Sequence, residues 1–88
     1  MDTIHGAVKD FVVTNFLFGR NTDLSDETSF LESGIVDSTG VLELVGFLEE
    51  HFGIVVADRE LLPENLDSIQ NVARFVARKL EESKERVG

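Results

Sequence analysis

Residues 30–45 read FLESGIVDSTGVLELV, and this stretch decides the fold of the chain. In this stretch a segment with several polar residues precedes apolar residues that recur at helical spacing. The apolar positions of that pattern are Val41, Val45, Leu48 and Phe52, with Leu44 beside them. Asp37 and Ser38 stand just before it, and both residue types serve as helix N-caps. We therefore expect a helix that begins at Asp37 or Ser38 and ends at Gly53.

Residues 3–18, nearer the N-terminus, form a second amphipathic pattern. Its apolar stripe consists of Ile4, Val8, Phe11 and Val12. Gly19 follows, where a helix can end in the left-handed conformation. Residues 20–36 are then expected to be one long polar loop, which Phe30 and Leu31 anchor by entering the core.

The chain after Gly53 predicts a short helix and a long one. Residues 54–56 are too few for an unpaired strand, so we expect a loop that dips into the core. Asp58 should cap a short helix, which Pro63 stops. Asp67 should cap the last helix, with Gln70 completing a capping box. The buried stripe of that helix is Ile69, Val72, Val76 and Leu80.

These elements predict an all-α fold, namely a small four-helix bundle with a long loop between its first two main helices. Three of the four helices are long and one is short. Eighty-eight residues are enough for one domain with a single core. We place this domain at residues 1–82 and treat residues 83–88 as a charged C-terminal tail, with fraying expected from Glu81.

The negative charge lies in the middle of the chain. The sequence has 8 Lys and Arg against 17 Asp and Glu, a formal net charge of −9. Residues 21–67 hold twelve of the acids and a single base, Arg59. Such a field argues against nucleic acid and favours basic protein surfaces as partners. The alternative is an acidic surface that only keeps a small domain in solution.

The residue types that catalysis would need do not come together. The chain has no cysteine, hence no thiolate nucleophile and no disulfide. His5 and His51 lie on different expected helices without a neighbouring nucleophile, and the glycines form no phosphate loop. We expect that the chain is not an enzyme. No apolar run approaches a membrane span and the N-terminus does not resemble a signal peptide, so we expect a cytoplasmic monomer that is not inserted in a membrane.

One metal site has to be weighed, a calcium loop of the EF-hand type. Asn21, Asp23, Ser25 and Glu32 occupy positions one, three, five and twelve of its spacing. Asp26 stands where the sharp turn of such a loop requires glycine, and Thr28 stands where an apolar residue usually holds the loop. We therefore expect no specific metal site.

Ser38 is the candidate for a covalent modification. It places a hydroxyl at the exposed start of a helix, where free amide groups and the helix dipole favour an anion. A phosphate ester on Ser38 would lie where the backbone suits negative charge. The Asp37–Ser38 pair taken alone is also compatible with a simple N-cap.

The wider pattern resembles the acyl carrier protein family, which binds phosphopantetheine. The signature of this family is Asp-Ser at the start of the second helix, with Glu-Leu five and six residues after the serine. The matching residues are Asp37-Ser38, Glu43-Leu44, Leu48-Glu49-Glu50 and Phe52-Gly53-Ile54. Gly34 and Gly40 make the chain most similar to stand-alone aminoacyl carriers such as D-alanyl carrier proteins. Thr39, Gly40 and Gly46 depart from the pattern of fatty-acid carriers.

The resemblance implies that a phosphopantetheinyl transferase joins 4′-phosphopantetheine to Ser38, next to the motif residue Asp37. The thiol of that arm would hold an acyl or aminoacyl group as a thioester, delivered by a loading ligase and presented to downstream acyl-processing enzymes. Residues 1–82 would be the carrier domain. The expected partner-binding residues are Thr39, Glu43, Glu49 and Glu50. The alternative is an acidic helical interaction module without a prosthetic group.

Overall fold

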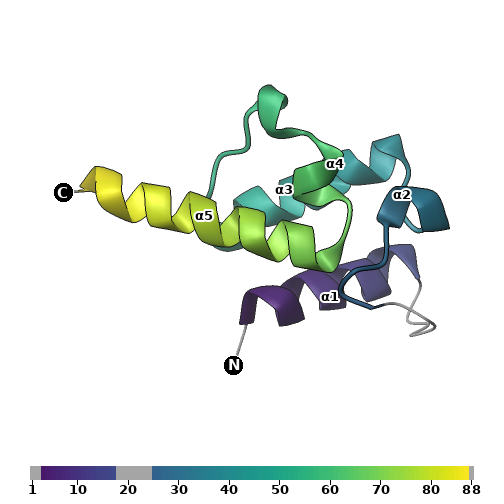
Figure 1. Ribbon diagram of the computed structural model, residues 1–88. Coiled ribbons are helices and arrows are strands. Elements are labelled where there is room, and N and C mark those ends of the chain that lie inside the picture. Colours follow the sequence, from purple (N-terminus) through teal and green to yellow (C-terminus); the bar gives the residue numbers. More distant parts are fainter. Residues whose placement is uncertain (1–2, 18–24, 88) are drawn as a thin grey trace.

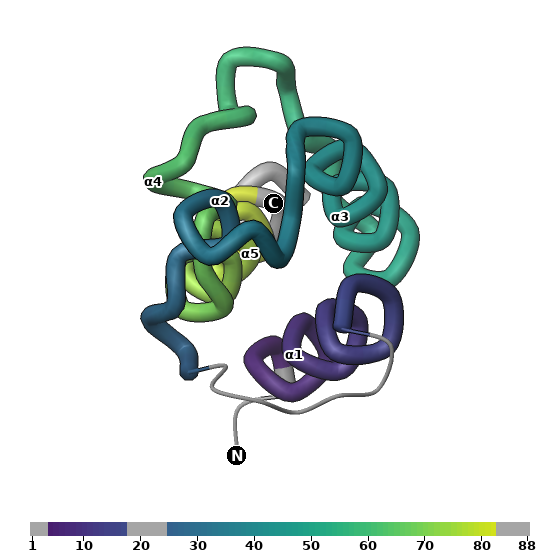
Figure 2. The backbone as a smooth tube through the Cα atoms, turned by 90° about the vertical axis from the view of Figure 1, so that its right-hand side faces the viewer, coloured from purple at the N-terminus to yellow at the C-terminus, as the bar shows by residue number. Residues whose placement is uncertain are grey.

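The computed structural model describes the chain from Thr3 to Leu17 and from Ser25 to Val87. Within these two segments every regular element is a helix, which confirms the predicted all-α class. Three helices are long: α1 (Thr3–Phe16), α3 (Ser38–Phe52) and α5 (Ile69–Val87). They surround a common centre, as Figure 1 and, nearly end-on, Figure 2 show. The predicted cap at Gly19 lies outside the described residues.

The connections hold more helix than the sequence predicted. They contain α2 (Phe30–Ser33), a 3₁₀ turn η1 (Asp58–Glu60) and α4 (Pro63–Leu66). The α2 helix lies in the predicted loop and forms because Ser29 Oγ accepts the Glu32 N–H at 3.2 Å. Gly34 ends α2 with a φ of 76°, a conformation that glycine adopts without steric cost.

The core is built by the predicted stripes of α1 and α5 and by one line of residues on α3. Fully buried side chains come from α1 (Val8, Val12), α3 (Leu44, Leu48) and α5 (Ile69, Val72, Phe75, Val76). The α3 register differs from the predicted one. Its innermost line begins at Gly40, whereas Val41, Val45 and Phe52 are only partly buried. At Gly40 the Phe16 side chain of α1 packs directly on α3, since an added Cβ would lie 2.9 Å from Phe16 Cε1.

Two predicted loop anchors are half right. Phe30 is buried, but its neighbour Leu31 is 47% exposed. Ile54 enters the core as expected, while Val55 is 76% exposed. In each pair only one of two adjacent side chains can face inward, because the backbone turns its neighbour toward solvent.

Two predictions about the second half of the chain are wrong in detail. Pro63 begins α4 instead of stopping a helix, since the first helical position needs no N–H. The cap of α5 is Ser68, whose hydroxyl oxygen accepts the Asn71 N–H at 3.1 Å, while Asp67 ends α4 and faces α2. The α5 helix extends to Val87 and so includes most of the expected tail.

The 3₁₀ turn η1 is held by Glu60 and not by the predicted cap Asp58. The Glu60 carboxylate accepts the Ala57 N–H at 2.9 Å and pairs with Lys79 Nζ at 3.0 Å. The Ala57 N–H, followed by the Lys79 ammonium, lowers the pKa of Glu60 below its ordinary value of 4.5, although partial burial acts in the opposite direction.

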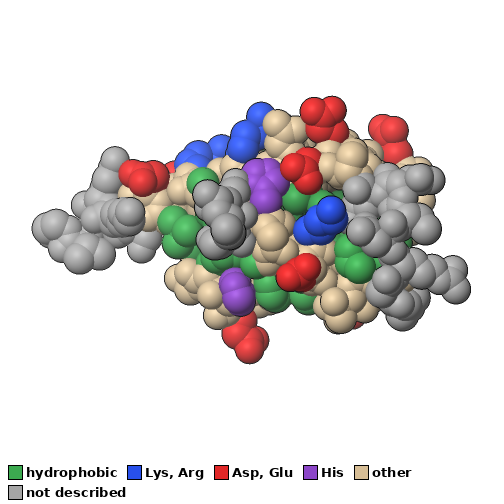
Figure 3. Space-filling model, turned by 90° about the horizontal axis from the view of Figure 1, so that it is seen from below, with side chains coloured by type: hydrophobic (Ala, Val, Ile, Leu, Met, Phe, Trp, Pro, Cys, Tyr) green, Lys and Arg blue, Asp and Glu red, His purple; other side chains and the backbone are tan. Residues whose placement is uncertain are grey.

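The face formed by α1 carries side chains of every kind. Figure 3 views the molecule from that side and shows hydrophobic side chains reaching the surface between acidic, basic and histidine side chains. No helix among the described residues has the length and apolar character needed to cross a membrane.

Candidate functional site

Asp37 and Ser38 have separate roles at the start of α3. Asp37 is the N-cap, and its carboxylate accepts the Gly40 N–H at 2.7 Å. Ser38 is the first helical residue and is exposed. Its hydroxyl has no hydrogen-bond partner among the described residues. The simple N-cap interpretation therefore applies to Asp37, and the Ser38 hydroxyl is left available for chemistry.

The backbone on both sides of Ser38 is firmly held. Val36, two residues before it, is buried and its N–H donates to the Phe30 carbonyl at 3.2 Å. Gly40, two residues after it, is buried against Phe16 and Val36, where a Cβ would lie 3.0 Å from Val36 Cγ1. Ser38 thus stands at the surface between two packed anchors, which fix the position of its backbone.

An apolar hollow of about 300 Å³ lies beside Ser38. Its lining is mostly apolar and comes from α2, α3 and the segment around α4. The aliphatic side chains in it are Leu31, Val41, Leu42, Leu61, Leu62 and Leu66, and Asp67 contributes a carboxylate. Three of these leucines are exposed, namely Leu31 at 47%, Leu42 at 61% and Leu62 at 42%. A hydroxyl beside this open surface leaves room for a long attached group.

Asp67 holds the α2 wall of this hollow in place. Its carboxylate accepts the Ser29 hydroxyl at 2.5 Å and the Leu31 N–H at 2.9 Å. Its backbone carbonyl accepts the Phe30 N–H at 2.7 Å. Three hydrogen bonds to one residue therefore tie α2 to the junction of α4 and α5. Sequence reasoning missed this contact because Asp67 also fitted the pattern of a helix cap.

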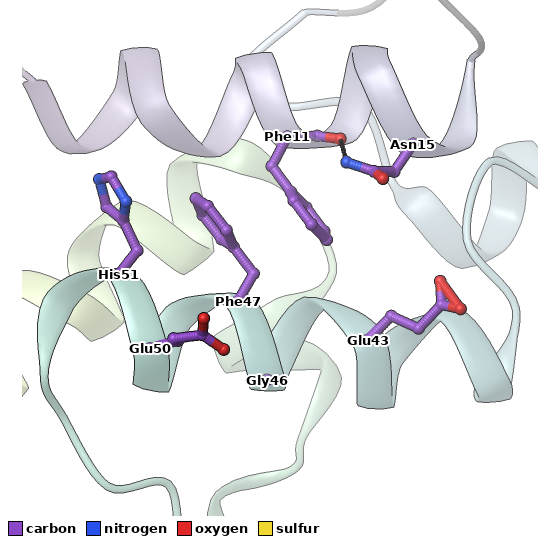
Figure 4. A pocket seen from close by; sticks show the side chains of 7 residues that line it. All are labelled: Phe11, Asn15, Glu43, Gly46, Phe47, Glu50 and His51. Carbon is purple, nitrogen blue, oxygen red and sulfur yellow. Dashed lines mark hydrogen bonds between the residues drawn. The ribbon is translucent and has the colours of Figure 1, made fainter.

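The predicted partner-binding residues fall into two groups. Thr39, Glu43 and Glu50 are exposed. Glu49 is partly buried and accepts the Val56 N–H at 2.9 Å, so it holds the loop after α3. Glu43 and Glu50 flank a groove between α1 and α3 (Figure 4), on a different side of α3 from the hollow beside Ser38.

The groove between α1 and α3 contains stacked rings that the sequence interpretation did not find. The Phe11 and Phe47 rings stack at 4.3 Å with an interplanar angle of 16°, and Phe47 stacks on His51 at 5.0 Å and 18°. Phe47 and His51 are four residues apart, the spacing of neighbours on a helix surface, which is the signal that would have revealed this pair.

Within the described residues no group of three or more His, Asp and Glu side chains could hold a metal ion. Asn21 and Asp23 of the calcium-loop pattern lie outside these residues. Of the other two positions, Ser25 pairs its hydroxyl with that of Thr28 at 3.0 Å, and Glu32 is exposed on α2.

The chain matches the family model "Phosphopantetheine attachment site" over residues 17–76. Three proteins similar to it are carriers by name. The "Probable acyl carrier protein PigG" of a Serratia species is 31% identical over 67 residues, 76% of this chain and 77% of the relative. The "Acyl carrier protein homolog" of Mycoplasmopsis pulmonis is 32% identical, covering 83% of this chain and 96% of the relative. The "Acyl carrier protein" of Bdellovibrio bacteriovorus is 34% identical, covering 86% and 94%.

A solved structure has the same fold. A chain in the "Crystal structure of FAD-dependent dehydrogenase" matches with a TM-score of 0.70 and 26% identity, covering 78% of this chain and 97% of that one. The helical fold and the match to the phosphopantetheine family model define a small phosphopantetheine carrier. The chain belongs to the acyl carrier protein family, whose members are carriers and not catalysts.

The cofactor of this carrier is 4′-phosphopantetheine, and the geometry around Ser38 fits it. The phosphodiester needs an accessible hydroxyl, and the hydroxyl of Ser38 is both exposed and unpaired within the described residues. The arm also needs open neighbouring surface, and the hollow beside Ser38 offers surface that is mostly apolar. When attached, the group supplies the thiol that the cysteine-free chain lacks.

Proposed function

We propose that Ser38 is the residue to which 4′-phosphopantetheine is attached. The observation that carries this proposal is the division of roles at the start of α3. Asp37 supplies the cap at 2.7 Å from the Gly40 nitrogen, so the neighbouring exposed hydroxyl is not needed by the helix. The free amide groups of the first turn also favour the negative charge of a phosphodiester at this position.

The proposed modifying enzyme is a phosphopantetheinyl transferase that uses coenzyme A. Ser38 Oγ loses its proton and forms the new bond to the phosphorus of the pantetheine phosphate. The bond from that phosphorus to adenosine 3′,5′-bisphosphate breaks, and this nucleotide leaves. The carrier then presents an acyl or aminoacyl thioester to biosynthetic enzymes.

Intact-protein mass spectrometry tests the attachment site. Incubation with coenzyme A, magnesium and a broad-specificity transferase should add about 340 Da, the mass expected of a phosphoester-linked arm. The Ser38→Ala variant should gain nothing. Ser33→Ala is the matched control, since Ser33 is another exposed serine and is not among the proposed partner-binding residues, and it should be modified like the wild type. An unmodified but folded wild type, or a modified Ser38→Ala variant, contradicts the proposal.

We propose that partner enzymes recognise α3 through Asp37, Thr39, Glu43 and Glu50. All four are exposed on the helix that begins at Ser38, or immediately before it. Glu49 was included in the sequence prediction, and its carboxylate contributes to such a surface while it holds the Val56 N–H. Replacing Glu43 or Glu50 by Lys should slow loading and weaken its dependence on salt. Unchanged loading rates in both variants would place recognition elsewhere.

The proposed cargo is an amino acid or another specialised acid, delivered by a dedicated ligase. This rests on the similarity of residues 34–40 to aminoacyl carriers. Local packing also explains why glycine stands at these two positions. Gly34 has a positive φ, and Gly40 lies in close contact with Phe16. The cargo is therefore best tested directly, by the mass of carrier purified from its source and by release of the cargo with hydroxylamine, which cleaves thioesters. A fatty acyl hydroxamate would contradict the aminoacyl assignment.

A FAD-dependent dehydrogenase is the first candidate among acyl-processing partners, because the solved structure that holds the similar chain is described in those words.

The proposal also includes a cytoplasmic monomer with a carrier domain at residues 1–82 and a tail at residues 83–88. Truncation after residue 82 tests the boundary, since the shortened chain should still fold and accept the arm.

A further inference from the structure

Two exposed arginines lie one turn apart on α5, where that helix packs against α4 (Figure 1). Arg74 and Arg78 are four residues apart, which is the spacing of neighbours on one helix surface. Each guanidinium donates to the side chain of an asparagine. We call the surface formed by Asn65, Asn71, Arg74 and Arg78 the α4–α5 face.

Arg74 is held in position by Asn71. Its Nη2 atom donates to Asn71 Oδ1 at 2.7 Å. Asn71 is fixed in turn, because its backbone N–H donates to the Ser68 hydroxyl at 3.1 Å and its side-chain amide donates to the Pro63 carbonyl at 3.4 Å. The guanidinium therefore has a defined place at the surface, so less side-chain entropy is lost when it binds a further group.

Arg78 is held by Asn65 and Phe75. Its Nη2 atom lies 3.5 Å from Asn65 Oδ1, and its guanidinium carbon lies 5.5 Å from the centroid of the buried Phe75 ring. Asn65 is itself fixed, since it is 8% exposed and donates its side-chain amide to the Glu60 carbonyl at 2.9 Å. The contact with Asn65 is long and uses one of five guanidinium N–H groups, which leaves the others free to bind an anion.

The charges of these two arginines are not neutralised within the part of the chain that the structure describes. The ion pairs of His5 with Asp26 and of Lys79 with Glu60 involve other bases. The amide oxygens of the two asparagines orient the guanidiniums without cancelling their charge. Acidic side chains are abundant, since the sequence has 17 Asp and Glu against 8 Lys and Arg. The α4–α5 face is therefore a local basic surface on an acidic protein.

The α4–α5 face is separate from the two hollows described above. None of its four residues lines the hollow beside Ser38 or the groove of about 730 Å³ between α1 and α3. The latter, the α1–α3 groove, is lined by Phe11, Asn15, Glu43, Gly46, Phe47, Glu50 and His51. The face does adjoin the hollow beside Ser38, because Pro63 lines that hollow and accepts the hydrogen bond from Asn71. A group bound to the arginines would thus lie next to the α4 wall and leave Glu43 and Glu50 uncovered.

We propose that the α4–α5 face is a docking site for an acidic segment of a partner protein. A planar guanidinium binds a carboxylate through two parallel hydrogen bonds, and two guanidiniums on successive turns suit two carboxylates of one segment. The net charge of −9 opposes such a segment at long range. At physiological ionic strength, however, charges are screened over about 8 Å, so the local arginines decide the binding. The carrier then offers its partners two surfaces of opposite charge.

The test uses the whole ¹⁵N-labelled carrier at an ionic strength of about 0.15 M, with an acetylated and amidated tetrapeptide of glutamates as the probe. In two-dimensional NMR the backbone signals of Asn71, Arg74 and Arg78 and the side-chain signals of both arginines should shift. The Kd should be on the order of millimolar, as expected for a few exposed charge pairs. The corresponding glutamine tetrapeptide should cause no shifts. Ser38→Ala should bind the glutamate probe like the wild type.

Arg74→Gln and Arg78→Gln should each weaken binding of the glutamate probe by at least about threefold, and the double variant by at least about tenfold. Arg59→Gln is the matched control, because it removes the same charge from another exposed arginine, in η1, and it should bind like the wild type. The variants in α5 should fold, since glutamine favours a helix about as well as arginine. Circular dichroism checks this.

Asn71→Asp tests whether the neutral partner of Arg74 matters. A carboxylate at this position would pair with Arg74 and neutralise it, so the variant should bind the probe at least about threefold more weakly. It should fold like the wild type, because Asn71 lies in the first turn of α5, where an acidic residue is favourable.

Several results would overturn the proposal. These are equal weakening by Arg59→Gln and Arg74→Gln, unchanged binding by Asn71→Asp, or shifts caused equally by the glutamine peptide. Inorganic phosphate that binds more tightly than the glutamate probe would assign the face to a phosphate group, which also overturns it. Attachment at Ser38 is measured separately by mass, so a failure of peptide binding refutes the docking site and leaves the attachment site standing.

Discussion

The two sides of α3 differ in how their apolar residues are used. Beside Ser38, Leu42 is 61% exposed and borders a mostly apolar hollow of about 300 Å³. On the α1 side, Phe47 is partly buried and stacked between Phe11 and His51. The same helix therefore carries one apolar side chain that is exposed to solvent, Leu42, and one that is packed between two rings, Phe47.

This difference separates stability from interaction. Exposed leucines bury little surface on folding and contribute little to stability, so the apolar surface near Ser38 is available to the arm proposed for Ser38 and to partners. The stacked rings stabilise the contact of α1 with α3 and at the same time line the α1–α3 groove. Variants on the two sides should therefore give different results, and the following predictions go from the largest expected effect to the smallest.

The largest difference is expected between Phe47→Ala and Leu42→Ala. Phe47→Ala removes a ring with two stacking partners and should lower the free energy of unfolding by about 3 kcal/mol. Leu42→Ala should change it by less than about 0.5 kcal/mol, as for other exposed positions. Urea unfolding followed by circular dichroism measures both. Comparable losses would show that the two sides contribute equally to folding.

The two glycines of α3 should respond in opposite directions to alanine. Gly40→Ala places a Cβ 2.9 Å from Phe16 Cε1 and 3.0 Å from Val36 Cγ1, and such overpacking should destabilise the fold by about 2 kcal/mol. Gly46→Ala has free space and should stabilise it by about 0.5–1 kcal/mol. Thermal unfolding of both variants gives the signs. Stabilisation by Gly40→Ala would mean that α1 and α3 separate easily at this contact.

The α2 wall beside Ser38 should depend on Asp67. Asp67→Ala removes the acceptor of the Ser29 hydroxyl and the Leu31 N–H, and it should cost about 1–2 kcal/mol. Asp58→Ala is the control, because Asp58 is exposed and caps nothing. Amide hydrogen exchange should accelerate at Phe30 and Leu31 in Asp67→Ala, while the signals of the α1–α3 groove stay unchanged. Accelerated exchange at Phe47 would contradict this prediction, because it would show that Asp67 also stabilises the contact between α1 and α3.

The smallest expected effect is the loss of stability in acid that comes from Glu60, in the 3₁₀ turn η1. The pKa of Glu60 is lowered by the Ala57 N–H and by Lys79, so its contribution to stability is present above its unfolded pKa of about 4.5. That contribution is lost as the pH falls through the lower folded value. The stability advantage of the wild type over Glu60→Gln should therefore shrink between about pH 6 and pH 3. An advantage that grows in acid would contradict the lowered pKa.

The sequence predicted what depends on periodicity. The three long helices, the buried stripes of α1 and α5, the end of α3 at Gly53 and the exposure of Ser38 follow from spacing and capping preferences. The sequence could not distinguish Gly40 from Gly46, because the difference lies in the approach of Phe16 from another helix. The sequence also predicted that Asp67 caps the last helix. In the structure its carboxylate instead accepts hydrogen bonds from Ser29 and Leu31, which precede it by 38 and 36 positions. Such contacts depend on tertiary packing and have no local signal.

The separation of the roles of Asp37 and Ser38 has a consequence for the order of events in the life of the protein. Since the helix is complete without the serine hydroxyl, folding can finish before any transferase arrives, and a modified chain keeps every internal bond of the unmodified one. Attachment at Ser38, as proposed, should then leave the fold unchanged. The cell can accordingly store the unmodified protein in its native shape and activate it on demand.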